Sequence, residues 1–210
     1  MTSLILIGAG GFGIEAALYA QDMVRTNTAS FEVKGFLDDT KEVGDHRVGL
    51  PILGGTDMPV DPSALYVITI AEPPHKRAFH ERLAAQGARF ATLIHPSAVI
   101  APTAQVGEGC VFAPFSFAGP ESFIGRHGTI NIYGSVAHET RLGDFCTFSP
   151  YAGTHGAAQL GDGIFMGAHA TVLKGIKIGN ACKIAAGAVV YNDMPDAHIA
   201  IGNPARFKNL

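Results

Sequence analysis

The feature that most constrains this chain is an apolar residue that recurs at every sixth position through its second half. The register runs from Ile94 to Val190 without a slip, and its members are all Ile, Leu, Val, Met or Phe except Ala118 and Thr154. Neither the 3.6-residue period of a helix nor the two-residue period of an ordinary strand produces this spacing. A period of six is typical of a parallel β-helix, in which each repeat supplies one short strand and one turn.

A second regularity supports the same architecture. The residue four positions after each apolar residue is nearly always small, and the residue that directly follows the apolar one is often glycine. Glycine and small residues allow a sharp corner between strands. Three repeats then form one triangular coil with the apolar side chains stacked inside, and about five coils fit into the repeat. The sequence therefore predicts a β-helix domain over residues 94–210, ending in a closing segment.

The three cysteines lie on the small position of this register. Cys110, Cys146 and Cys182 follow one another at equal intervals of six repeats, which places two coils between neighbours. Adjacent parallel strands lie about 4.8 Å apart, so the sulfur atoms are expected roughly 10 Å from one another. A disulfide requires Cα atoms within about 7 Å. We therefore interpret the cysteines as packing residues, in preference to disulfide partners, metal ligands or nucleophiles.

The first half has the alternating pattern of a small α/β domain. A glycine-rich turn follows the first apolar run and is followed by apolar residues at helical spacing. Alternating strands and helices favour a parallel sheet. We predict a Rossmann-like domain over residues 1–93. The expected strands are Thr2–Ile7, Phe31–Leu37, Leu65–Ile70 and Phe90–Ile94, with a helix near His75–Gln86.

Two motifs in this domain point to a nucleotide. Gly8–Gly13 matches G-x-G-x-x-G in the strand–turn–helix context that phosphate binding requires. Asp38 and Asp39 follow the second predicted strand, where a carboxylate can bond a ribose hydroxyl. The domain is too short for two mononucleotide-binding halves, so a single nucleotide is favoured over NAD. A tight turn without a ligand and a solvated strand end are the alternatives.

Composition excludes several classes of function. The chain has 15 Lys and Arg against 18 Asp and Glu, a net charge of -3, which argues against a nucleic-acid-binding protein. Its 47% apolar content argues against disorder. The apolar stretch Ser63–Ala71 is too short to span a bilayer. The first residues lack the basic region of a secretion signal, so a cytoplasmic protein is expected.

One histidine stands beside a carboxylate at a position where the β-helix would expose it. His138 lies two residues after the inward-facing Val136 and directly before Glu139. A carboxylate can orient an imidazole and improve it as a general base. Positions three repeats apart are neighbours in adjacent coils, so His138 is expected beside Gly156, whose N–H could stabilise a developing oxyanion. The alternative is a surface histidine that contacts another subunit.

Other positions are weaker candidates. Pro150, Ala168 and Ala186 form one file along the prism, where exposed backbone would suit a long, thin ligand with amide groups. His155 and His169 are interpreted as surface or interface residues and His95 as a residue of the domain junction.

Several motifs in order resemble those of a known family. The second half resembles the hexapeptide-repeat acyltransferases, which have a left-handed parallel β-helix. Nearly the whole chain resembles one branch, the sugar acetyltransferases related to sialic acid O-acetyltransferase and the bacillosamine-pathway N-acetyltransferase. The resemblance rests on Gly8–Gly13, Phe36–Asp39, His95–Ala98, Val136–Glu139, Phe148–Pro150 and Gly202–Arg206.

This resemblance implies acetyl-CoA as cosubstrate, a nucleotide-linked amino sugar as acceptor, and no metal. It implies a homotrimer with active sites between neighbouring prisms, and a role in the biosynthesis of a surface polysaccharide or another glycan. N-acetylation of a 4-amino-deoxy sugar is the expected reaction, and O-acetylation of the sialic-acid type is the alternative.

The resemblance also implies roles for individual residues. His138 matches the catalytic base and Glu139 its partner, and Asn131 lies where relatives contact the sugar. Thr147 stands where relatives often carry a second histidine, so a hydroxyl or His155 would have to take its place. The residues implied for the nucleotide sugar are Gly10, Gly11, Phe12, Asp38, Asp39 and Asn131, and those implied for acetyl-CoA are Thr147, His155, Gly156, Ala168 and Ala186.

Three rival functions explain less of the sequence. A zinc hydratase of the γ-carbonic-anhydrase type also uses a trimeric left-handed β-helix, but the histidines here lack its ligand spacing. A nicotinamide oxidoreductase would explain the glycine turn and leave the six-residue repeat unexplained. A non-catalytic protein that binds a nucleotide sugar or CoA would leave the His138–Glu139 pair without a role.

Overall fold

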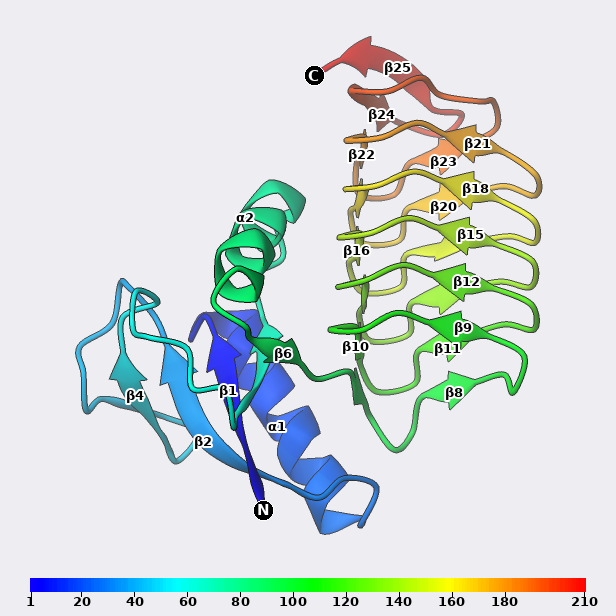
Figure 1. Cartoon of the computed structure of the whole chain (residues 1–210). Coiled ribbons are helices and arrows are strands. Elements are labelled where there is room, and N and C mark those ends of the chain that lie inside the picture. Colours follow the sequence, from blue (N-terminus) through cyan, green and yellow to red (C-terminus); the bar gives the residue numbers. More distant parts are fainter. The chain divides into compact units, whose positions relative to one another are not determined.

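The computed structural model describes all 210 residues. They form two compact units, Met1–Pro96 and Ser97–Leu210 (Figure 1). The division predicted after residue 93 falls inside strand β7 (Leu93–Ile94). Each unit is described by itself.

The first unit is a six-stranded sheet with two helices. Strands β1, β2, β4, β5 and β6 run parallel where they pair, and β3 adds an antiparallel edge to β4. The order across the sheet is β3-β4-β2-β1-β5-β6, so the chain moves to one side of β1 and then to the other. The bounds are β1 (Thr2–Ile7), α1 (Gly11–Arg25), β2 (Phe31–Leu37), β3 (His46–Arg47), β4 (Leu50–Gly54), β5 (Leu65–Ile68), α2 (Pro73–Ala84) and β6 (Arg89–Phe90).

The sequence of β1 explains its central place. Leu4, Leu6 and Ile7 are fully buried, as expected for a parallel strand that is covered on both faces. Helix α1 buries Ala16, Ala17 and neighbouring small residues. Small side chains on that face allow a helix to pack closely against its neighbours.

Three details of the first unit differ from the prediction. The strand expected over Leu65–Ile70 ends at Ile68, and the strand expected over Phe90–Ile94 is divided between β6 and β7. The β3–β4 hairpin was not predicted, because a two-residue strand such as His46–Arg47 is too short to show a period.

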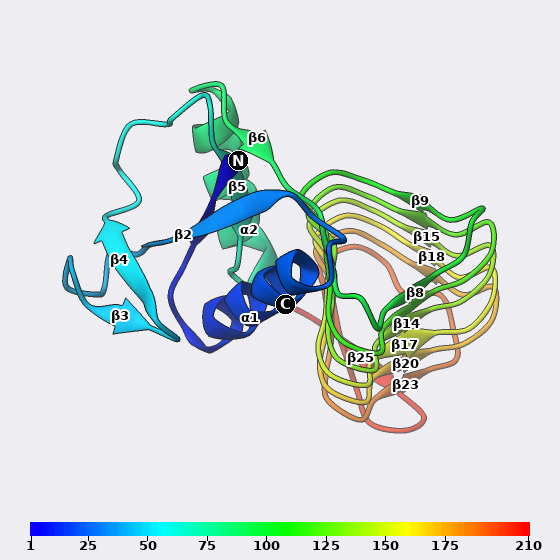
Figure 2. The ribbon, with the colours of Figure 1, turned by 90° about the horizontal axis from the view of Figure 1, so that it is seen from below.

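The second unit is the predicted β-helix. Two-residue strands stack into three parallel sheets, seen almost end-on in Figure 2. Paired residues lie one coil apart along the chain, as for Ile130 and Phe148. The first sheet contains β10 (Val111–Phe112), β13 (Thr129–Ile130), β16 (Thr147–Phe148), β19 (Phe165–Met166), β22 (Lys183–Ile184), β24 (His198–Ile201) and β25 (Arg206–Asn209).

The other two sheets are formed in the same way. The second contains β8 (Val99–Ile100), β11 (Phe117–Ala118), β14 (Ser135–Val136), β17 (Gly153–Thr154), β20 (Thr171–Val172) and β23 (Val189–Val190). The third contains β9 (Gln105–Val106), β12 (Phe123–Ile124), β15 (Arg141–Leu142), β18 (Gln159–Leu160) and β21 (Lys177–Ile178). The antiparallel β24–β25 hairpin forms the predicted closing segment.

The core of the β-helix is the file of residues that the six-residue register places inside. Phe112, Ile130, Phe148 and Met166 stack within the first sheet with no exposed surface. Truncation of one such phenylalanine to alanine typically costs about 3–5 kcal/mol. The three cysteines are buried in the prism, as expected for packing residues, and none of them forms a disulfide. Each thiol donates to a backbone carbonyl, for example from Cys110 Sγ to Gly125 O at 3.1 Å.

The corners correct one expectation about glycine. From Val106 to Ile184, the residue three positions after the interior residue is left-handed and is often not glycine; Tyr133, Glu139 and Tyr151 have φ values of 54°, 58° and 62°. The glycine that directly follows the interior residue is needed for a different reason. A Cβ on Gly125 would lie 2.6 Å from Gly143 C and from Asp144 Oδ1 of the next coil. This glycine therefore permits the close approach of two coils rather than a sharp turn.

Candidate active site

His138 and Glu139 form an exposed pair at the corner between the second and third sheets. His138 Nδ1 lies 2.8 Å from Glu139 Oε2, and the two side chains are 52% and 56% exposed. Consecutive side chains of an extended strand point to opposite faces. The left-handed backbone at Glu139 instead brings its carboxylate to the side of the imidazole. A proton on Nδ1 can be donated to this carboxylate, which leaves the Nε2 lone pair free to accept another.

The imidazole packs directly over Gly156 of the next coil. A Cβ on Gly156 would collide with His138 Cε1 and Nε2 and would lie 3.0 Å from Cδ2. The neighbour relation predicted from the repeat is therefore present. It places Cε1 and Nε2 of the imidazole where a side chain at position 156 would lie.

The backbone around these corners offers unused hydrogen-bond donors. At the corner between the third and first sheets, the N–H two residues after the interior residue is occupied in consecutive coils: Asp144 Oδ1 accepts the N–H of Arg126 at 2.8 Å, and Asp162 Oδ1 accepts that of Asp144 at 2.9 Å. At the corners of the predicted site, the N–H groups of Gly156, Ala168 and Ala186 donate to no acceptor in the chain. Of these three residues, Gly156 is buried beneath His138, Ala168 is half-buried and Ala186 is exposed.

A single chain does not bring all of the predicted residues together. Gly156 shares a corner with His138, and the exposed His155 directly precedes it. Ala168 and Ala186 lie at a different corner, between the first and second sheets. The predicted residues therefore form two groups on the surface of one prism.

Asn131 and Thr147 lie apart from the His138–Glu139 pair within one chain. Asn131 follows β13 at the corner of Ala168, and its Oδ1 accepts the N–H of Ile132 at 2.7 Å. Thr147 lies in β16, where it is 3% exposed and its N–H donates to Ile164 O at 2.8 Å. One chain therefore places neither residue against His138.

The predicted glycine turn lines a pocket in the first unit. A hollow of about 240 Å³ lies at the carboxyl ends of β1, β2 and β5, and its walls include Gly8, Gly10, Asp38, Asp39 and Thr69. Gly11 and Phe12 begin α1 beside it but are not part of its walls. No side chain caps this end of the helix. A helix N-terminus with uncapped N–H groups favours an anion.

The glycines of the turn have different reasons to be there. Gly8 has a φ of 104°, which other residues rarely adopt. A Cβ on Gly13 would collide with the carbonyl oxygen of Gly8. Around Gly10 and Gly11 nothing lies within 4 Å of an added Cβ, so packing within the chain does not require glycine there. Open space at these two positions is what the close approach of a ligand would need.

Asp38 and Asp39 have partners inside the chain. Asp38 Oδ2 accepts the N–H of Ala9 at 2.6 Å, and Oδ1 accepts the N–H and Oγ1 of Thr40 at 2.8 and 2.7 Å. Burial raises the pKa of Asp38, but these hydrogen bonds outweigh it and hold the pKa below its usual value. Asp39 accepts the N–H and Oγ1 of Thr56 at 2.6 and 2.7 Å. Both carboxylates thus shape the wall of the pocket.

Two threonines of this pocket were missed by the sequence analysis. Thr69 Oγ1 is 2.8 Å from both Ile7 O and Gly8 O, which fixes the start of the glycine turn. Thr56 links Asp39 to Arg82, whose Nη2 donates to Thr56 Oγ1 at 2.8 Å. Neither threonine belongs to a motif, so only the structure reveals them.

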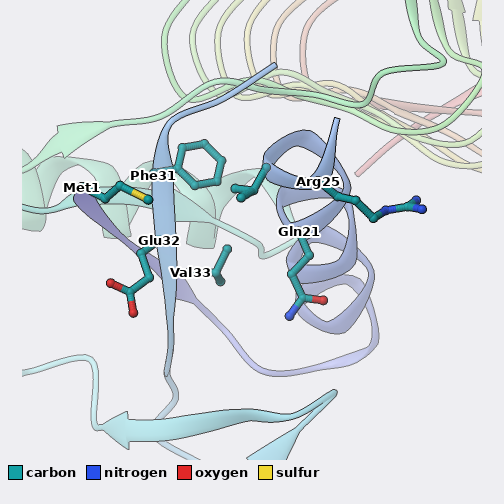
Figure 3. Close-up of a pocket in the computed structure, with 7 residues that line it drawn as sticks. Met1, Gln21, Arg25, Phe31, Glu32 and Val33 are labelled. Atoms are coloured by element: carbon teal, nitrogen blue, oxygen red, sulfur yellow. The ribbon is translucent and has the colours of Figure 1, made fainter. Parts of the chain in front are cut away.

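A second hollow of the first unit lies at the other end of the strands. It has a volume of about 310 Å³, and Figure 3 shows Arg25 and Glu32 pointing away from each other at its rim. Its lining residues are Met1, Gln21, Val24, Arg25, Phe31, Glu32 and Val33. None of the predicted site residues lies here.

Two further observations concern metal ions and membranes. No three His, Cys, Asp or Glu side chains are grouped closely enough to hold a metal ion. Neither helix has the length and the apolar composition needed to cross a membrane.

Comparison with known proteins agrees with this geometry. No family model matches the chain. GDP-perosamine N-acetyltransferase of Escherichia coli O157:H7 is 28% identical over 208 residues, covering 96% of this chain and 94% of that protein. Serine acetyltransferase of Helicobacter pylori (strain ATCC 700392 / 26695) is 34% identical over 145 residues, covering 68% of this chain and 78% of that protein. The chain belongs to the hexapeptide-repeat acetyltransferases.

A solved structure matches this hexapeptide-repeat acetyltransferase along its whole length. It is a mutant of perosamine N-acetyltransferase from Caulobacter crescentus in complex with CoA and GDP-perosamine. The TM-score is 0.88 at 25% identity, and the match covers 100% of this chain and 98% of that chain. The family resemblance and the β-helix predicted from the sequence are therefore confirmed.

Proposed function

We propose that this acetyltransferase transfers the acetyl group of acetyl-CoA to the amino group of a nucleotide-linked amino sugar. A 4-amino-deoxy sugar that serves as a precursor of a surface polysaccharide or another glycan is the expected acceptor. The observation that carries the proposal is the His138–Glu139 pair packed over Gly156, whose N–H is free. Matches along nearly the whole chain to two perosamine N-acetyltransferases, one of them solved with CoA and GDP-perosamine, support it.

His138 acts as the general base in this proposal. Its Nδ1–H donates to Glu139 Oε2, so Nε2 can take a proton from the sugar amine as the new C–N bond forms. The bond between the acetyl carbon and sulfur breaks, and the proton then passes from Nε2 to the departing thiolate. Orientation of the two reactants contributes much of the rate. The reaction needs no metal and no covalent enzyme intermediate.

Free backbone donors fit the cosubstrate. Acetyl-CoA supplies a reactive thioester and a pantetheine arm with amide carbonyls. In the proposed complex, Gly156 N–H donates to the thioester oxygen as negative charge develops on it. Ala168 and Ala186 N–H groups suit the pantetheine carbonyls. Basic residues toward the C-terminal coils would meet the CoA phosphates, namely Lys174, Lys177, Lys183, Arg206 and Lys208.

A homotrimer would join the two groups of site residues. Within one chain, His138 and Gly156 lie at one corner of the prism, and Asn131, Ala168 and Ala186 at another. A neighbouring copy could set its second corner against the first corner of this chain. We therefore propose, from the family resemblance, a homotrimer with active sites between adjacent prisms. Thr147 or His155 would then take the place of the second family histidine.

The first unit is proposed to hold the nucleotide. Its pocket lies outside the carboxyl ends of the strands at the point where the strand order reverses, which is where open α/β sheets bind ligands. The glycine turn through Gly10, Gly11 and Phe12 suits the phosphates. Asp38 and Asp39 fix the pocket wall that the ribose and base would meet. Because of this strand order and pocket, we regard the unit as Rossmann-like. We also propose a cytoplasmic location for the enzyme.

Thiol release from acetyl-CoA tests the proposal. The assay compares UDP-, GDP- and dTDP-linked 4-amino sugars with their 4-hydroxy counterparts. We expect release with an amino sugar and a loss of about 10²–10⁴-fold in kcat for His138→Ala. His46→Ala, which removes an exposed imidazole from strand β3, is the matched control and should retain activity. Wild-type turnover in a folded His138→Ala protein would overturn the role of His138, and release with hydroxy sugars alone would make the enzyme an O-acetyltransferase.

A further inference from the structure

The ladder of the second sheet is interrupted at one place, between β14 and β17, just before His138 in the chain. In the coils on either side, both residues of each strand of the second sheet are paired: Ala118 pairs with Val136, and Thr154 pairs with Val172. Between β14 and β17 only Ser135 and Gly153 are paired. The missing pair is Val136 with Thr154. The backbone that leads into His138 therefore departs from the regular ladder.

A threonine side chain replaces the missing ladder bond. In the coils on either side, the N–H that follows the interior residue donates to the carbonyl of the next coil's interior residue, from Gly119 to Val136 O and from His155 to Val172 O, both at 2.8 Å. The N–H of Ala137 instead donates to Thr154 Oγ1 at 3.2 Å. Thr154 is the one polar residue at an interior position of the repeat, and it is only 4% exposed.

A second buried hydroxyl extends this bond to the next coil. Thr140 Oγ1 lies 3.3 Å from Thr154 Oγ1 and 3.3 Å from His155 O, and Thr140 is completely buried. Because Thr154 Oγ1 accepts from Ala137, a consistent chain of donors runs from Ala137 N–H through Thr154 and Thr140 to His155 O. These hydroxyl contacts are long for hydrogen bonds, so each is individually weak.

The equivalent hydroxyl of the preceding coil behaves differently. Ser122 lies one coil before Thr140, and its Oγ donates at 2.7 Å to Gly119 O within its own turn. Thr140 instead reaches across to the coil of Gly156. The pair of threonines therefore joins the residue before His138 to the residue before Gly156, which are the two groups that the proposed reaction must hold in register.

We propose that Thr154 and Thr140 are positioning residues, which set the backbone of the His138 turn relative to the Gly156 N–H. This inference rests on the proposed role of His138 as the base. A valine at 154 would match Val136 and Val172 in the same file but would offer no acceptor to Ala137. Ala137 N–H would then pair with the backbone carbonyl of residue 154, as in the other coils, and would carry His138 with it.

The experiment compares Thr154→Val and Thr154→Ser with the wild-type enzyme. We expect Thr154→Val to fold with an equal or higher Tm and to lose about 10- to 100-fold in kcat, because a displacement near 1 Å can cost that much. KM for acetyl-CoA and for the amino sugar should change by less than about twofold, since neither threonine faces solvent. Thr154→Ser, which keeps the hydroxyl, should recover most of kcat.

Ser122→Ala is the matched control. It removes a buried hydroxyl from the equivalent position of the coil before Thr140, so its kcat should equal that of the wild type. A wild-type kcat for folded Thr154→Val would overturn the proposal. If Thr154→Val fails to fold, Thr140→Val decides by the same criterion, because it breaks the chain of donors and leaves Thr154 in place.

A crystal structure of Thr154→Val separates this inference from the proposed function. We expect Ala137 N–H to bond the backbone carbonyl of residue 154 and the His138 ring to move from its place over Gly156. A ring in the wild-type position would overturn the positioning role even if no amino sugar were found to react. Movement of the ring, in an enzyme that acetylates none of the sugars tested, would support the positioning role and count against the proposed acceptor.

Discussion

Replacing Gly156 by alanine tests whether the packing of His138 over the next coil serves catalysis. The backbone of Gly156 lies outside the left-handed region, so alanine adds no backbone strain there. The new methyl group would nevertheless collide with Cε1 and Nε2 of His138. Because the His138 side chain is 52% exposed, the ring can swing outward while the prism stays folded. The substitution therefore moves the proposed base and leaves its chemical identity unchanged.

The size of the effect follows from the distance that the ring must travel. Carbon atoms in ordinary contact are about 3.5–4.0 Å apart, so the ring has to retreat by about 1 Å or more. A misplacement of about 1 Å can cost about 10²-fold in rate. The expected loss in kcat for Gly156→Ala is therefore about 10²-fold, within the range expected for complete removal of the base. The Tm should stay close to that of the wild type.

The assay is thiol release from acetyl-CoA with the reactive amino sugar, together with a thermal unfolding curve. Gly175→Ala is a suitable control: nothing lies within 4 Å of its added Cβ, and Ala157, one coil earlier, has the same left-handed backbone. It should retain kcat and lose about 1–2 kcal/mol of stability from the left-handed alanine. A Gly156→Ala enzyme with wild-type kcat and Tm would refute the argument that the position of His138 over Gly156 matters.

Two further predictions concern the first unit, whose unfolding can be followed by circular dichroism at 222 nm because both helices belong to it. Gly13→Ala should lower the stability of this unit by about 1–3 kcal/mol, since the new Cβ meets the Gly8 backbone. Gly11→Ala, with open space around its new Cβ, should keep the stability and raise KM for the nucleotide sugar. Equal stability of the two variants would contradict this prediction. The pKa of Asp38 is lowered in the folded chain, so its ionised form stabilises the fold above its unfolded pKa of about 3.9, and this contribution is lost as pH falls through the lowered folded value. Asp38→Asn should therefore be less stable than the wild type at pH 7, with a difference that narrows below about pH 4; a difference independent of pH would count against the hydrogen bonds to Ala9 and Thr40.

The six-residue period was sufficient to predict the β-helix because every coil repeats the same steric demand. An inward side chain must stack on its equivalent in the next coil, so a single register fixes the strands, the sheets and the neighbours of each residue. The 18-residue length of a coil alone predicts that His138 lies beside Gly156, as the structure shows. The register also identified the three cysteines as buried packing residues.

The sequence could not predict which hydrogen-bond partners the polar side chains have. The position of Asp38 after a strand predicts a contact with a ribose, which stays a prediction, but it does not reveal that the Asp38 oxygens accept hydrogen bonds from Ala9 and Thr40. Strand order and residue type do not determine which acceptor a loop N–H will use. The β3–β4 hairpin was missed for a related reason, since two residues are too few to show a period.

Thr154 shows most clearly where periodic reasoning ends. In the sequence it is only an exception to an apolar register, and the small size of Ala118, the other exception, causes no break in the ladder. The register specifies that Thr154 points inward beneath Val136. It does not specify that the hydroxyl accepts the N–H of Ala137 in place of a backbone carbonyl. A polar residue at an interior position must find a partner, because burying an unpaired hydroxyl is costly. In this chain the partners of Thr154 Oγ1 are the N–H of Ala137, just before His138, and the hydroxyl of Thr140. The one polar residue among the interior positions therefore lies directly beside the turn that carries the proposed base.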